Sequence, residues 1–220
     1  MMAGRMKPLW VPLLVFAIAL ALIRLTGADF ALCDWSFDRA SMGFPWRFSP
    51  GADQLHRGSR DVVIGLGIVA AALALVGDRT GKPPTREVAR MVTLSLILST
   101  SLIAVMKTAI NRSCPWSYTR YGGTVVEGSE QPMLQLGNHE AAFPAGHAAG
   151  GYSFMVLYFA GRRRSAPAAA AGLAFGLVFG TFLGVSQVVR GAHFLSHNVW
   201  TALICWYVAW GVDRLVPRPG

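Results

Sequence analysis

The sequence predicts an all-α fold, a bundle of about six transmembrane helices with one further segment at the outer surface of the membrane. Two observations indicate this fold class. Of the 220 residues, 53% are hydrophobic and only 14% are charged. Apolar runs close to the ~20 residues that cross a bilayer recur along the whole chain. We therefore expect residues 1–220 to form a single membrane domain.

Six apolar segments are the predicted spans. The first covers 9–25, and Arg5 and Lys7 precede it as they would precede a signal peptide. No clear small-residue cleavage site follows Leu25, so we expect a permanent helix here. The other five segments cover 62–76, 91–110, 147–160, 168–189 and 199–212. The second and fourth segments are short, and each needs the glycine and histidine residues at its ends to complete a span.

Three connecting segments have a recognisable character. Residues 27–60 are rich in aromatic side chains, which favour the headgroup zone, so an interfacial helix or belt is expected on the outer side. Residues 77–85 contain Gly-Lys-Pro-Pro-Thr, a sequence that ends a continuous helix. Residues 111–142 form an outer loop of about thirty residues, a length that is usually functional when it is ordered.

The net charge of +9 follows the predicted topology. The segments predicted on one side of the membrane are the N-terminus, 78–90, 162–164 and the C-terminal tail. They hold 11 of the 20 basic residues and only 3 of the 11 acidic ones. Lysine and arginine are enriched in cytoplasmic loops, so both termini are expected in the cytoplasm. The basic excess is thereby accounted for, and no nucleic-acid partner is expected.

The three cysteines leave one alternative open. Cys205 lies in the last predicted span, where a small core residue is the expected role. Cys33 and Cys114 both fall on the outer side, where an oxidising compartment permits a disulfide. Their spacing does not decide whether they pair.

Two histidines mark the predicted site. His147 and His193 each lie near a glycine where an apolar segment meets water, a position at which an ionisable side chain is usually functional. Lys107 and Arg112 close the third span, and Arg190 precedes His193 by three residues. The predicted topology brings these stretches to one membrane face. Cations can hold phosphate oxygens while one imidazole attacks phosphorus and another acts as acid and then base, so the set indicates phosphoryl transfer.

This chemistry needs no metal, and no cofactor is expected. The one alternative is a zinc site, for which His193 and His197, four residues apart, form the only candidate pair. The remaining histidines, His56 and His139, are expected to be loop residues without a catalytic role.

The three stretches resemble the motifs of the PAP2 (type 2 phosphatidic acid phosphatase) superfamily of integral-membrane lipid phosphatases. Its motifs read Lys-x6-Arg-Pro, Pro-Ser-Gly-His and Ser-Arg-x5-His-x3-Asp, in that order. In this chain the matching positions are Lys107 with Cys114-Pro115, then Pro144-Ala145-Gly146-His147, and then Ser186-Gln187, His193 and His197. The resemblance covers most of 107–212, and the motifs fall within 107–198.

The resemblance implies a role for each motif residue. It makes His193 the nucleophile, His147 the general acid and base, and Lys107 a ligand of the phosphate. Four positions depart from the motifs. They are Cys114, Ala145, Gln187 and His197, where the family has arginine, serine, arginine and aspartate.

Neighbouring residues are candidates to replace the missing groups. Arg112 and Arg190 could supply the two guanidinium groups, and the backbone N–H groups around Gly146 could replace the serine as phosphate donors. For the aspartate that orients the nucleophile, the candidates are His197, Asn198 and Glu140.

The expected function is a metal-independent phosphoric monoester or pyrophosphate hydrolase that acts on lipids through a phosphohistidine. The resemblance implies a multi-pass protein of the bacterial inner membrane, with its site on the periplasmic side and a lipid phosphate among the membrane lipids as its substrate. Candidate substrates are undecaprenyl pyrophosphate, phosphatidylglycerol phosphate, phosphatidic acid and lipid A phosphate. Two alternatives stay open, a lipid-to-lipid phosphotransferase and a non-catalytic lipid-binding member of the same fold. The oligomeric state also stays open.

Overall fold

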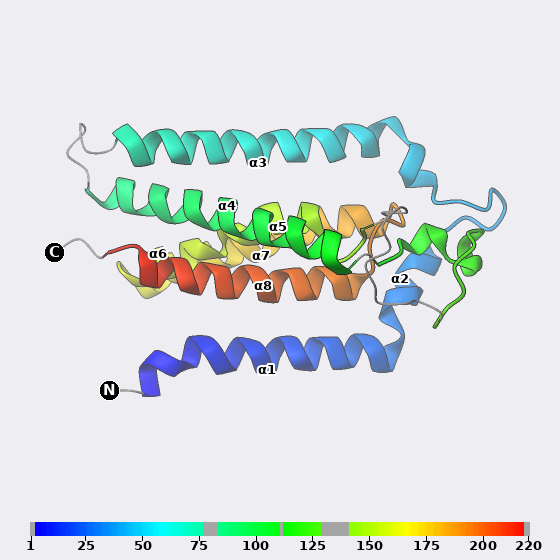
Figure 1. Ribbon diagram of the computed structural model, residues 1–220, viewed down its shortest axis with the longest axis horizontal. Coiled ribbons are helices and arrows are strands. Elements are labelled where there is room, and N and C mark those ends of the chain that lie inside the picture. The colour runs from blue at the N-terminus through cyan, green and yellow to red at the C-terminus, as the bar shows by residue number, and fades with distance from the viewer. Residues whose placement is uncertain (1–2, 77–82, 111, 129–140, 218–220) are drawn as a thin grey trace.

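The computed structural model describes residues 3–76, 83–110, 112–128 and 141–217, and it is a bundle of helices (Figure 1). The α-helices are α1 (Ala3–Thr26), α2 (Ala28–Ser36), α3 (Pro50–Val76), α4 (Pro83–Ile110), α5 (Gly146–Tyr152), α6 (Val156–Arg162), α7 (Ala166–Val188) and α8 (Leu195–Leu215). Short 3-10 turns are η1 (Pro45–Phe48), η2 (Pro115–Ser117), η3 (Thr119–Tyr121) and η4 (Ser153–Met155). The predicted all-α fold is confirmed.

Several of these helices can cross a membrane. By length and composition α3, α7 and the segment that contains α4 qualify, and α1 with α2 adds a fourth if this pair, bent by 63°, is one span. Large apolar side chains such as Leu14, Ile68 and Val178 point outward and are 63%, 64% and 69% exposed. Such faces are stable against lipid and costly in water. The count of six spans remains a prediction.

Different helix ends lie at the two ends of the bundle. The termini end is where α1 and α4 begin and where α6 and α8 finish, and the loop end is where α2, the start of α5 and the start of α8 lie (Figure 1). Every residue that the sequence marked as catalytic lies toward the loop end. The start of α1 and the end of α8 therefore lie at the opposite end of the bundle from the predicted site (Figure 1).

Helix α3 corrects a predicted boundary. It begins at Pro50, about three turns before the predicted start of its span at residue 62. The Ser49 hydroxyl accepts a hydrogen bond from the Ala52 N–H and caps the first turn, and Arg57 pairs with Asp53 one turn earlier. Because charged residues line this extension, its low hydropathy concealed a helix. The predicted outer segment 27–60 is correspondingly shorter and consists of α2, η1 and the residues between them.

Helices α5 and α6 pack on α7 with their backbones in contact. A Cβ atom added to Gly151 of α5 would lie 2.5 Å from the Cα of Gly180 in α7. One added to Gly176 would lie 2.5 Å from the backbone nitrogen of Met155. Small residues permit this close approach in membrane helices, and the contact is driven by dispersion and not by burial from water. We refer to Gly151, Gly176 and Gly180 as the glycine seam.

The termini end is held by a buried arginine. Arg163 follows α6, its side chain is only 7% exposed, and it forms ion pairs with Glu87 of α4 and Asp213 of α8. Its guanidinium also donates to the main-chain oxygens of Asp213 and Val216. The sequence alone gives no sign of this role. The charge of Arg163 ties α4, α6 and α8 together.

Cys33, Cys114 and Cys205 are all buried, and the structure has no disulfide between Cys33 and Cys114, which lie in its described part.

Candidate active site

The site forms at the loop end because α4 and α7 end there and α5 and α8 begin there. Helix α4 brings Lys107 in its last turn, and α5 brings His147 in its first turn. The turn between α7 and α8 carries Arg190 and His193. A Cβ atom on Gly146, the residue before His147, would lie 3.6 Å from Lys107 Nζ, and after burial and His197 the charge of Lys107 lowers the pKa of His193.

His193 is fixed by a main-chain group. Its Nδ1 lies 2.5 Å from the carbonyl oxygen of Ala142. Because a carbonyl only accepts, Nδ1 carries the proton, and the neutral ring keeps its lone pair on Nε2. Ala142 is itself held, since its N–H donates to the Arg112 carbonyl at 2.8 Å. An anchored carbonyl thus serves as the partner of the predicted nucleophile.

The sequence had offered three side chains for this orienting role. His197 lies near His193, with ring centroids 6.1 Å apart and planes at 70°. Asn198 is buried with its carboxamide against Gly184 of α7. Glu140 lies outside the described residues. A backbone carbonyl is invisible in a search for acidic side chains, so nothing in the residue types pointed to Ala142.

Burial of His193 keeps its ring neutral. The surrounding protein removes water from the imidazole, and the nearby His197 and Lys107 add positive potential, so the pKa of His193 is lowered well below 6.5. A nucleophilic imidazole must be unprotonated. The burial and the local charge therefore favour the reactive form at neutral pH.

His147 and Arg190 each have a buried nitrogen without a protein partner. Among the described residues, nothing hydrogen-bonds to His147 Nε2 or to Arg190 Nε, although both atoms are inaccessible to solvent. Buried polar groups are nearly always paired, so each exception needs an explanation. A bound anion that accepts from both groups is one, and these residues are the ones for which the sequence predicted phosphate chemistry.

Lys107 approaches the start of α5 closely. A Cβ atom on Gly146 would lie 3.6 Å from Lys107 Nζ, an ordinary contact distance, so the ammonium group lies against the first residue of α5. The neighbouring Ala145 is fully buried, and its N–H donates to the Thr201 hydroxyl at 2.9 Å. The N–H of Ala145 is thereby already used and does not belong to the donors expected to replace the missing serine.

Gln187 and Arg190 occupy adjoining space, as the predicted replacement requires. Arg190 Nη1 lies 3.5 Å from Gln187 Oε1. Gln187 is buried at 3% exposure, where an arginine would stand if the motif were intact. The guanidinium of Arg190 thus reaches the region of the missing one from the turn that follows α7.

His56 is a site residue that sequence reasoning missed. It lies in the early turns of α3, and its Nδ1 is 3.2 Å from Gln187 Oε1. Its ring stacks on the His147 ring with centroids 4.0 Å apart and planes at 29°. The expectation that His56 lies in a loop is therefore wrong, because it lies within α3. His139 lies outside the described residues.

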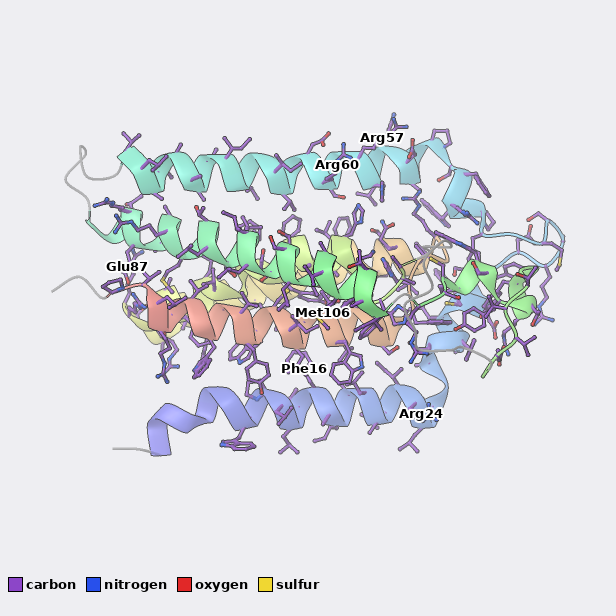
Figure 2. The ribbon with its side chains drawn as sticks, viewed as in Figure 1. Phe16, Arg24, Arg57, Arg60, Glu87 and Met106 are labelled. Carbon is purple, nitrogen blue, oxygen red and sulfur yellow. The ribbon has the colours of Figure 1, made fainter. Side chains whose placement is uncertain are left out.

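Arg112 faces a cavity beside the site. The cavity measures about 630 Å³ and lies between α1, α4 and α8. Arg112 lines it with His197 and with Arg24, which Figure 2 places at the loop end of α1. The rest of the wall includes apolar residues such as Ile23 and Trp200, and it also includes Asp29. Arg112 and His197 thus adjoin a partly apolar, partly cationic space.

No group of three or more metal-binding side chains is found in the described part of the chain. In the pair proposed for zinc, Nδ1 of His193 is taken by the Ala142 carbonyl.

Comparison with known proteins gives one match. The family description "PAP2 superfamily" matches residues 89–219, which include α5 to α8, most of α4 and the whole set of motif positions. Comparisons with curated proteins and with solved structures found no match. His56 and Arg24 lie outside the matched residues.

Proposed function

The chain belongs to the PAP2 superfamily, a family of phosphatases, and from this premise we propose that it hydrolyses a lipid phosphate or pyrophosphate through a phosphohistidine on His193. The observation that carries the proposal is the pair of buried, unpartnered nitrogens on His147 and Arg190, next to Lys107. A phosphoryl group supplies the acceptors that these donors lack. The neutral ring of His193 supplies the nucleophile.

The reaction takes two steps. In the first, the Nε2 lone pair of His193 forms a bond to phosphorus while the bond from phosphorus to the lipid oxygen breaks, and His147 gives that oxygen its proton. In the second, water attacks the phosphohistidine, His147 takes the proton from the water, and phosphate leaves as the nitrogen–phosphorus bond breaks. Lys107 and Arg190 stabilise the charge on the transferring oxygens.

The carbonyl of Ala142 supports the first step. As the nucleophile attacks, the His193 ring becomes cationic, and the Nδ1–H bond to Ala142 strengthens. This is the task that an aspartate performs in the family motif. A carbonyl carries less negative charge than a carboxylate, so we expect slower attack but an orientation that is equally fixed.

A lipid substrate is supported by the surroundings of the site. The cavity that adjoins His197 combines arginines with aromatic and aliphatic walls, which suits an amphiphile with an anionic head. The exposed apolar faces of α1, α3 and α7 support a position of the site at the edge of a bilayer. With the basic residues of the termini end in the cytoplasm, the loop end faces the periplasm.

Phosphate release from purified protein tests the proposal. We expect a panel of lipid phosphates and pyrophosphates to yield inorganic phosphate in the presence of EDTA, and His193→Ala to release none. Rapid quenching under alkaline conditions should trap an acid-labile phosphoryl group in the wild type alone. Activity that is lost with a chelator and restored by zinc would contradict the nucleophile. A folded wild type that is inactive on the whole panel would favour a lipid-binding role, and transfer of phosphate to a second lipid would identify a phosphotransferase.

A further inference from the structure

A third imidazole contacts the proposed acid and base. His56 comes from α3, outside the residues matched to the family, and its ring lies flat against that of His147 at 4.0 Å. Helix α3 is close to α5 beyond this contact, because a Cβ atom on Gly150 would meet the Val63 side chain at 3.1 Å.

The stacked geometry limits what His56 can do. The N–H bonds of an imidazole lie in the ring plane, so two rings at 29° and 4.0 Å do not pass a proton directly from one to the other. The contact instead fixes the plane of the His147 ring. Its Nε2 is then held in the buried position where it has no protein partner in the described part of the chain.

Gln187 fixes His56 in turn. The amide oxygen Oε1 only accepts, so His56 donates from Nδ1 at 3.2 Å, and Arg190 approaches the same oxygen with Nη1 at 3.5 Å. An arginine at position 187 would offer no acceptor to Arg190, so it could not bridge His56 and Arg190 as Gln187 does. The glutamine that departs from the family motif is thus the residue that connects His56 to the phosphate side of the site.

We propose that His56 is a positioning residue for His147. It holds the ring of His147 edge-on to the transferring phosphate and offers its π face to the imidazolium that His147 becomes when it is protonated. A cation against an aromatic face is stabilised, and a ring held within the productive angle loses less rate to misorientation. This inference rests on the proposed function, because it assigns a role within that reaction.

Three substitutions of His56 separate stacking from hydrogen bonding. His56→Ala removes both, His56→Gln keeps a polar donor without a ring, and His56→Phe keeps a ring face without a donor. We expect His56→Ala and His56→Gln to lower kcat by roughly 10- to 100-fold with KM nearly unchanged. We expect His56→Phe to recover most of that loss. Arg60→Gln is the matched control, since Arg60 lies one turn further along α3 (Figure 2) with its side chain 62% exposed.

The opposite pattern would overturn the proposal. If His56→Gln keeps full activity and His56→Phe does not, or if the loss is in KM alone, then His56 is a substrate ligand. If His56→Ala matches the wild type while thermal unfolding is unchanged, the contact has no role in catalysis. A loss shared by all three variants and accompanied by a lower unfolding temperature would show a structural role only.

A measurement without turnover keeps this test separate from that of the proposed function. The ring protons of His147 should show an upfield ring-current shift in the NMR spectrum of the detergent-solubilised protein. We expect the shift to vanish in His56→Ala and to persist in His56→Phe. If the wild type releases no phosphate, the proposed function fails, and the shift alone then decides whether His56 holds His147. Its absence from the wild type would overturn the positioning role.

Discussion

The two ends of the bundle treat buried cations in opposite ways. At the termini end, Arg163 is paired with Glu87, which Figure 2 shows there, and with Asp213. At the loop end, no carboxylate of the described residues forms an ion pair with Lys107 or Arg190, and Arg190 Nε has no hydrogen-bond partner there. A cation whose bonds are complete holds helices together, whereas one whose bonds are incomplete is placed to meet a ligand. The difference gives a physical criterion for telling structural charges from functional ones at a membrane edge.

The largest expected effect is at the termini end. Arg163→Ala would leave Glu87 and Asp213 buried without a partner, and breaking such an ion pair costs about 3–5 kcal/mol. We expect unfolding in detergent at a clearly lower temperature or denaturant concentration, while the protein that remains folded keeps its kcat. Arg162→Ala, next to it, serves as the control. Unchanged stability of Arg163→Ala would mean that the ion pairs of the termini end do not hold the helices together.

The converse effect is expected at the loop end. Lys107 forms no ion pair with a carboxylate of the described residues, so Lys107→Met leaves no buried charge without its partner. The stability of the protein should therefore stay the same or rise. Activity should fall about 10²- to 10³-fold, the usual cost of one lost donor to a developing charge. Phosphate release and thermal unfolding measured on the same preparation check both halves. A large loss of stability would mean that Lys107 is structural, like Arg163.

Replacing Arg190 by lysine tests the geometry of the cation at the loop end, because the charge stays the same. A guanidinium binds phosphate oxygens as a planar fork, which an ammonium group cannot reproduce. We expect Arg190→Lys to lower kcat/KM by at least about tenfold, in line with hydrogen bonds to charged groups of roughly 1.5–3 kcal/mol. Arg60→Lys on the exposed face of α3 should have no effect. Full activity in Arg190→Lys would show that only the charge matters there.

The smallest expected effect is a shift with pH. The pKa of His193 is lowered in the folded protein by burial and then by His197 and Lys107, so a proton binds the unfolded state more readily. Stability from this group is therefore present above pH 6.5 and is lost as the pH falls below it. The acid limb of phosphoenzyme formation, where the His193 ring becomes protonated, should likewise lie well below pH 6.5.

His197→Asp tests the cause of that shift. It replaces a neighbouring imidazole by the carboxylate found in the family motif, which should raise the pKa of His193 and move the acid limb of the rate to higher pH. Single-turnover rates between about pH 4 and pH 8 would show the displacement. A limb that does not move would mean that His197 contributes little to the potential at His193.

Sequence reasoning predicted the features that depend on residue type and order along the chain. The helical class and the motif positions could be read from apolar runs and from spacing, and Arg190 does lie beside Gln187. The features it missed depend on contacts between distant residues. His56 and Gln187 are 131 positions apart, and only the packing of α3 against α5 and α7 brings them together.

Two other features escaped for different physical reasons. The orienting group of His193 is a main-chain carbonyl, and every residue has one, so the side chain of Ala142 gives no sign of it. The role of Arg163 escaped because positive charge at a loop marks topology whether or not the charge is paired. Pairing depends on Glu87 and Asp213, which lie 76 and 50 positions away.

The glycine seam couples the membrane interior to the chemistry. Helix α5 begins at the proposed acid and base, and α7 leads directly into the turn that carries the nucleophile. Because Gly151 and Gly180 leave no room even for a methyl group, these two helices cannot slide or roll past each other without a clash. The contact between α5 and α7 at the glycine seam therefore sets the distance between His147 and His193. An alanine at Gly151 or Gly180 would push the two helices apart and move His147 away from its place in proton transfer.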